Sequence, residues 1–114
     1  MRFEEHAIDN VIVTKVLDNR VTADEAAQLK EQILKCVNHG YNSIILDLSE
    51  VTFIDSSGLG ALISSLKSVG QAGTLAISGA RSPVMTTFRL TRMDRVFRMY
   101  NSTHDALQAL SANN

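Results

Sequence analysis

The chain has 114 residues, which is enough for one hydrophobic core but too few for two comfortable ones. Hydrophobic residues make up 45% of the sequence and charged residues 20%, a balance that excludes a disordered or fibrous chain. Residues 1–55 hold ten acids and five bases (−5), and residues 56–114 hold two acids and six bases (+4), so one globular domain, 1–114, is expected with an acidic first half and a basic second half.

The beginning of the chain predicts a β-hairpin followed by a helix. A turn signal separates two predicted strands, Phe3–Ala7 and Val11–Leu17, and the second is rich in β-branched residues. Thr22, with Glu25 three residues later, fits the capping-box pattern that starts a helix. This helix is expected to stop at His39-Gly40, because glycine adopts the left-handed terminal conformation at little cost.

The middle of the chain predicts a buried strand, a polar turn and a second helix. Ser43–Leu48 is a nearly continuous apolar run, typical of a strand that is covered on both faces. A second short apolar stretch follows at Val51–Ile54. The polar run Asp55–Gly58 then overlaps the start of a helical pattern, Ser56–Val69, which ends near Gly70.

The end of the chain predicts two further strands, each followed by a helix. Thr74–Ser78 is an apolar strand. Pro83 suits the first turn of the next helix, whose apolar residues are Val84, Phe88 and Leu90. A short strand, Val96–Tyr100, and a helix capped by Thr103, Thr103–Leu110, complete the chain.

The predicted element order is ββαβαβα(β)α. Strands that alternate with helices after an initial hairpin predict an α/β fold. We expect a mixed, mostly parallel sheet of four to five strands, with one antiparallel edge and about four helices.

We expect neither a membrane-spanning segment nor a signal peptide in this sequence. No apolar run approaches the roughly 20 residues that cross a bilayer, and the acidic N-terminus lacks the apolar segment of a signal peptide. The single cysteine, Cys36, cannot form an internal disulfide and favours a reducing compartment. We therefore expect a cytoplasmic protein that does not insert into membranes.

The sequence offers little for catalysis. None of the three histidines lies in a metal-ligand spacing with the cysteine or with a carboxylate motif. There is no P-loop, and Gly58-Leu59-Gly60 lacks the third glycine of a dinucleotide-binding fingerprint. Ser56 and Ser57 are not set in a nucleophile elbow, so a small serine hydrolase is the weakest alternative. We expect no enzymatic activity, no metal and no cofactor.

Five arginines gather in the basic second half: Arg81, Arg89, Arg92, Arg95 and Arg98. This part of the chain has no basic run interleaved with aromatic residues and no nucleic-acid-binding motif, so no nucleic-acid partner is expected. The favoured interpretation is a solvated stripe that partly faces an acidic partner or a neighbouring helix.

The run Asp55-Ser56-Ser57-Gly58 has two interpretations. It can be a helix cap, since a polar side chain there satisfies the first free amides and contributes about 1 kcal/mol. It can also be a place where a phosphoryl group is added and recognised. Three consecutive polar residues exceed what a cap needs, and glycine in a first turn costs about 1 kcal/mol against alanine. The close approach of another backbone would explain such a glycine.

The stretch Asp47–Gly60, DLSEVTFIDSSGLG, resembles the signature of the STAS domain, and most of all the stand-alone anti-sigma-factor antagonists of bacterial sporulation and stress signalling. The segment from Ser82 to Phe97 is similar to that family's C-terminal helix and strand. The resemblance implies a protein-binding switch. In such a switch the unphosphorylated form binds an anti-sigma factor that is also its serine kinase, with a histidine-kinase-like ATPase fold. Phosphorylation releases this partner, and a serine phosphatase resets the switch.

The resemblance also implies which residues act. The family's phosphate acceptor directly follows the aspartate, which is Ser56 here, with Ser57 as the fallback. The implied partner-binding residues are Asp55, Ser56, Ser57, Gly58, Leu59, Gly60, Thr22 and Asp24. Many members carry an aspartate where this chain has Thr22, so Asp18 or Asp24 could replace it and the partner is left open. The alternative is a non-switching STAS scaffold, or a subunit of a larger complex.

Overall fold

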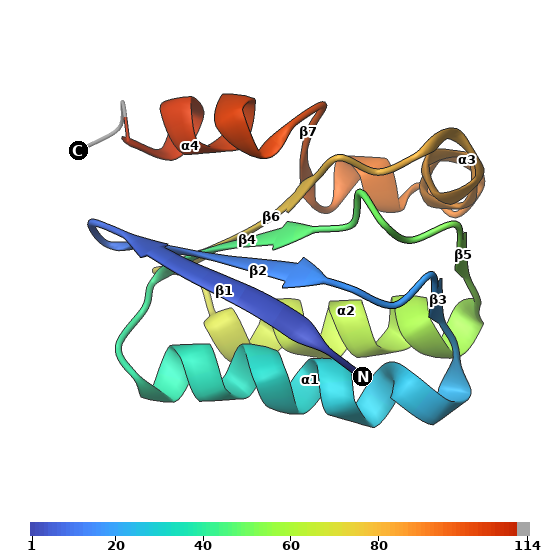
Figure 1. Cartoon of the computed structure of the whole chain (residues 1–114), viewed down its shortest axis with the longest axis horizontal. Coiled ribbons are helices and arrows are strands. Elements are labelled where there is room, and N and C mark those ends of the chain that lie inside the picture. The colour runs from blue at the N-terminus through green and yellow to red at the C-terminus, as the bar shows by residue number, and fades with distance from the viewer. Residues whose placement is uncertain (112–114) are drawn as a thin grey trace.

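Strands and helices are interspersed along residues 1–111, the part of the chain that the computed structural model describes (Figure 1). The strands are β1 (Phe3–Ile8), β2 (Val11–Val16), β3 (Arg20–Val21), β4 (Ser43–Asp47), β5 (Phe53–Ile54), β6 (Thr74–Ser78) and β7 (Arg98–Tyr100). The helices are α1 (Ala23–Asn38), α2 (Ser56–Val69), α3 (Ser82–Leu90) and α4 (Thr103–Ser111), with a short 3-10 helix, η1 (Met93–Arg95).

Five strands form one mixed sheet in the order β1-β2-β4-β6-β7. Only β1 runs antiparallel to its neighbour, and the other three pairings are parallel. The predicted α/β fold class, with a mostly parallel sheet, an antiparallel edge and four helices, is confirmed. A second sheet of two strands, β3 and β5, was not predicted, because each strand has only two residues.

The strands separate two apolar layers because successive side chains point to opposite faces of the sheet. Helices α1 and α2 cover one face, and α4 covers the other (Figure 1). Ile44 and Leu46 of β4 belong to the larger core on the side of α1 and α2. Ile45, between them, packs with Ala106 and Leu110 of α4. As expected for a strand covered on both faces, all three β4 residues are fully buried.

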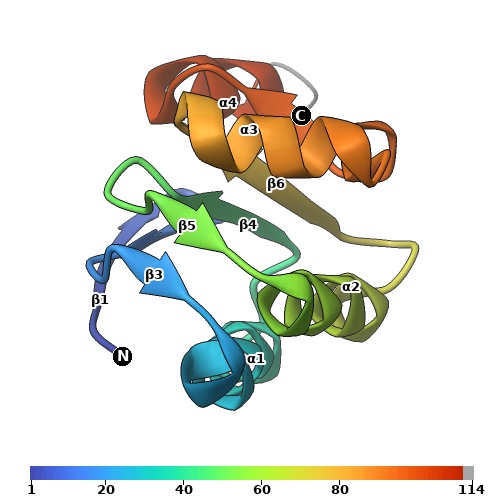
Figure 2. The same cartoon turned by 90° about the vertical axis from the view of Figure 1, so that its right-hand side faces the viewer.

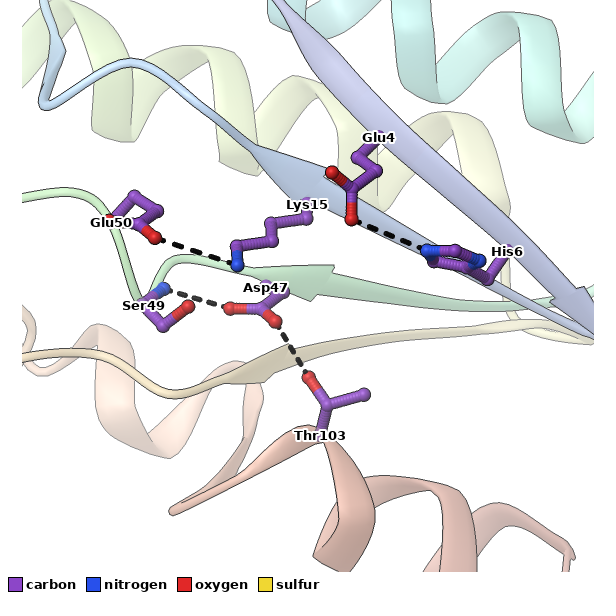
Figure 3. A network of polar contacts seen from close by, with 7 residues as sticks. All are labelled: Glu4, His6, Lys15, Asp47, Ser49, Glu50 and Thr103. Atoms are coloured by element: carbon purple, nitrogen blue, oxygen red, sulfur yellow. Dashed lines mark hydrogen bonds and ion pairs between the residues drawn. The ribbon is translucent and has the colours of Figure 1, made fainter.

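The predicted cap of α4 is wrong by one residue. The Ser102 side chain caps this helix, and its hydroxyl accepts a hydrogen bond from the Asp105 amide at 3.1 Å. The Thr103 hydroxyl instead donates to Asp47 Oδ2 on β4 at 3.0 Å. Asp47 Oδ1 also accepts the Ser49 amide at 2.8 Å, so Asp47 lies between Ser49 and Thr103 (Figure 3). This contact ties the start of α4 to the end of β4.

Two other predicted details differ in the structure. The Thr22 side chain caps no backbone amide of α1, and its hydroxyl donates to the Glu25 carboxylate at 2.9 Å. The predicted capping box is therefore replaced by a bond between the two side chains. Leu90, counted among the apolar residues of α3, is 81% exposed, while Val84 and Phe88 are fully buried.

Candidate functional site

The predicted site residues come from two segments that the small sheet brings together. Strand β3 pairs in parallel with β5, with Val21 opposite Ile54. The Asp55 amide then donates to the Val21 carbonyl at 3.2 Å. Helices α1 and α2 start directly after these paired strands, so Thr22 and Asp55 begin two neighbouring helices (Figure 2).

Asp55 is the residue that caps α2. Its backbone is extended, with φ −99°, and its carboxylate accepts a hydrogen bond from the Gly58 amide at 2.9 Å. Ser56 and Ser57 therefore occupy the first two helical positions and are both exposed. Within residues 1–111, neither serine side chain forms a hydrogen bond. The structure thus separates two roles that the sequence had left combined: a carboxylate closes the helix, and two hydroxyls face solvent.

Gly58 is buried because this chain's own backbone passes close to it. A Cβ atom at this position would lie 2.5 Å from the Val21 carbonyl oxygen and 2.8 Å from Ile54 Cγ1. The close approach that the sequence suggested is therefore made by β3 within the molecule. Leu59 is also buried and belongs to the larger core, whereas Gly60 is exposed, and a Cβ atom added there would meet nothing within 4 Å outside the helix's own backbone.

The polar side chains near the start of α1 have different surroundings. Thr22 is half-buried and occupied by its bond to Glu25, while Asp24 is exposed in the first turn. Asp18 accepts a hydrogen bond from the Arg2 amide at 2.9 Å and so helps to hold the N-terminal strand. Of the two carboxylates considered as replacements at the Thr22 position, only Asp24 is left without a hydrogen bond in the described part of the chain.

A contact that the sequence did not indicate lies on the strand pair that precedes the serines. The Arg20 guanidinium stands over the ring of Phe53, 4.6 Å from the ring centroid. These residues face each other across the β3–β5 pair, and Phe53 is 43% exposed. They are 33 positions apart in the sequence, so only the pairing of two very short strands brings them together.

None of the three histidines lies on α2, the helix that carries the exposed hydroxyls of Ser56 and Ser57. His6 lies on β1, His39 follows α1, and His104 lies in the first turn of α4, all outside the β3–β5 region. Among residues 1–111, no group of three or more His, Cys, Asp or Glu side chains could hold a metal ion. In the same range, none of the helices combines the length and the apolar character needed to span a bilayer.

Comparison with known proteins matches one family model to nearly the whole chain. The family model for the STAS domain matches residues 5–106. A Thermotoga maritima protein, provisionally named an anti-sigma factor antagonist, is 30% identical over 109 residues, which cover 93% of this chain and 95% of that protein. The anti-sigma-F factor antagonist RsfB of Mycobacterium tuberculosis is 32% identical over 82 residues, or 72% of this chain and 67% of RsfB.

A solved structure shows the same arrangement of elements. The crystal structure of an anti-sigma factor antagonist from Mycobacterium paratuberculosis aligns with a TM-score of 0.85 at 28% sequence identity. The alignment covers 95% of this chain and 92% of that chain. The likeness therefore extends over nearly the whole of both chains.

Proposed function

The chain belongs to the STAS domain family, and we propose that it is a protein-binding switch of the anti-sigma factor antagonist type, controlled by phosphorylation of Ser56. One observation carries the proposal. The Ser56 hydroxyl is exposed at the first turn of α2, while the neighbouring Asp55 does the capping. A kinase can therefore modify the serine without removing the hydrogen bond that starts the helix.

Phosphorylation of Ser56 would change the charge of the exposed surface around it. A phosphoryl group adds about −1.5 to −2 charges at neutral pH. At Ser56 it would stand next to Asp55, in a region where Asp24 is also exposed. A partner that accommodates the neutral serine would then face like-charge repulsion and a desolvation cost. A penalty of about 3 kcal/mol would reduce affinity roughly a hundredfold.

The same charge should leave the free protein folded. The N-terminus of a helix favours negative charge, because the free amides there donate hydrogen bonds and the positive end of the helix dipole lies there. Ser56 occupies this position in α2. The modification would therefore act on binding more than on stability.

We propose a partner of the kind that the name of RsfB states, an anti-sigma factor, which would also be the serine kinase, with a histidine-kinase-like ATPase fold. A serine phosphatase would reverse the modification, and the protein itself would act in the cytoplasm without catalysing a reaction. Direct contacts would come from the exposed groups Ser56, Ser57, Gly60 and Asp24. Asp55, Gly58, Leu59 and Thr22 would hold these groups in position.

The first test is to map phosphorylation on protein isolated from its own cells in the presence of phosphatase inhibitors. We expect one phosphoryl group, on Ser56, by mass spectrometry. Ser56→Ala should remove it, and Ser57→Ala, the matched control one position along the same exposed turn, should retain it. Modification that persists at Ser57 in the Ser56→Ala protein would contradict the assignment.

The second part of the test measures binding. The Ser56→Ala protein serves as bait, and the protein that it retains is identified, purified and titrated. We expect Ser56→Ala to bind like the wild type and Ser56→Glu to bind at least tenfold more weakly. Equal affinity of both variants would identify a non-switching scaffold instead. Turnover of substrates in an activity screen, lost in both serine variants, would identify an enzyme.

A further inference from the structure

Residues 89–98, from the end of α3 through η1 to the start of β7, expose apolar side chains on a well-anchored segment. Leu90 is 81% exposed, the largest fraction among the large hydrophobic side chains of residues 1–111, and Val96 is 48% exposed. Leu90 lies two positions after the buried Phe88, and Val96 directly precedes the buried Phe97. Phe88 and Phe97 pack edge to face, with ring centroids 6.0 Å apart, so the segment is held from both ends. The exposure of Leu90 therefore does not come from a loose chain.

The same segment carries a concentration of unpaired positive charge. Four of its ten residues are exposed arginines: Arg89, Arg92, Arg95 and Arg98. No arginine side chain of this group forms an ion pair or a hydrogen bond within the described residues. Asp94, half-buried, is the one acid of the segment, which leaves a net charge of +3 (four minus one). We call residues 89–98 the basic-apolar surface.

Arg92 has an unfavourable backbone conformation. Its φ of 61° and ψ of 19° place it in the left-handed region, which residues other than glycine and asparagine rarely adopt. It lies between α3 and η1, where glycine would fit without strain. The strain at Arg92 therefore supports a functional role for its side chain.

We propose that the basic-apolar surface docks an acidic segment of another protein, one in which Asp or Glu residues flank an apolar side chain. Leu90 and Val96 would bury the apolar side chain, and the arginines would pair with the carboxylates. Arginine suits this partner because its planar guanidinium binds a carboxylate through two parallel hydrogen bonds. No lysine follows Lys67 in the chain, so all the basic side chains here have this geometry.

Other charged partners fit the surface less well. Two exposed apolar side chains offer little area for insertion into a membrane, since the other side of α3 is buried through Val84 and Phe88. Nucleic acid would leave Leu90 without an apolar contact. Helix α3, whose last residues begin the surface, lies across β5 from α1 (Figure 2), and the serines lie on a different element, α2. The proposal therefore does not depend on phosphorylation of Ser56.

The test uses a fluorescently labelled synthetic peptide of alternating glutamate and leucine, titrated against the purified chain by anisotropy. We expect Arg95→Glu to weaken binding about tenfold and Leu90→Ala about fivefold. Matched controls are Arg2→Glu, an exposed arginine on the other half of the chain, and Leu34→Ala, a leucine of α1 that is 41% exposed. Both controls should stay within about twofold of the wild type.

Arg92→Gly separates docking from folding. Because glycine relieves the left-handed conformation, this variant should melt about 2 to 4 °C higher than the wild type while binding the peptide more weakly. Ser56→Glu should bind the peptide unchanged. Equal binding by the wild type and the Leu90 and Arg95 variants would overturn the proposal. So would preferential binding of phosphatidylserine vesicles or of duplex DNA, or self-association abolished by Arg95→Glu.

Discussion

Two glycines in the first turns of α2 have opposite surroundings. Gly58 touches the backbone of β3, where an added Cβ would meet the Val21 carbonyl at 2.5 Å, while Gly60 has no atom within 4 Å of that position. We expect Gly58→Ala to lower the free energy of unfolding by about 2 kcal/mol, because a backbone atom cannot move aside cheaply. Gly60→Ala, the matched control, should raise it by about 0.5 to 1 kcal/mol. Urea unfolding measures both. A Gly58→Ala protein as stable as the wild type would show that β3 is free to shift.

Cys36 is a buried thiol whose ionisation differs between the folded and unfolded chain. Burial raises the pKa of this thiol above its ordinary value, more than its contact with the Thr14 hydroxyl lowers it. The unfolded chain therefore releases the proton at lower pH than the folded protein. The buried neutral thiol therefore favours the folded protein. This contribution to stability is fully present below the pKa of the unfolded chain and is lost as the pH rises through the pKa of the folded protein.

Stability measured from about pH 7 to about pH 10 should therefore decline more steeply for the wild type than for Cys36→Ala. The comparison is between slopes, because the alanine variant also leaves a cavity that lowers stability at every pH. Parallel slopes would mean that the thiol ionises equally in both states.

At the scale of elements, a chain of hydroxyls holds α4 to the sheet. The Thr103 hydroxyl donates to Asp47, so the buried Ser78 hydroxyl, 2.7 Å from it, donates to Thr103. Thr103→Val would leave Ser78 without a partner within the described residues, and we expect a loss of about 1 to 3 kcal/mol. Thr86→Val, on the exposed side of α3, should change stability by less than about 0.5 kcal/mol.

Amide hydrogen exchange reports where that loss occurs. In the Thr103→Val variant, exchange should become faster in α4 and change less in α2, because the Thr103 contact holds α4 and not α2 to the sheet. Uniform acceleration over all helices would indicate that α4 does not open independently of the sheet.

At the scale of the whole molecule, local signals predicted the large elements well and long-range contacts less well. Helix α2 has its predicted bounds because Asp55 caps one end and Gly70, with φ 79°, terminates the other. The β3–β5 sheet was missed because four residues acquire strand geometry only by pairing with each other across 33 positions. The cap of α4 was misplaced because Asp47, far away in the sequence, engages Thr103.

The candidate site was predictable to a similar degree. The run from Asp55 to Gly60 carries a recognisable pattern of residues, and Thr22 was placed near it by resemblance. The burial of Gly58 and Leu59 and the stacking of Arg20 on Phe53 depend on the fold of β3 against β5, which no local pattern encodes.

The assignment of the α2 cap to Asp55 has a consequence for the cell. Proteases degrade proteins in proportion to how often they open, so a modification that weakened the helix would also lower the amount of protein. Since the carboxylate of Asp55 holds the Gly58 amide, a phosphoryl group on Ser56 should leave turnover nearly constant. The fraction of phosphorylated molecules would then change while the total amount of the protein stays constant. Removal of the phosphoryl group would reverse the signal without new protein synthesis.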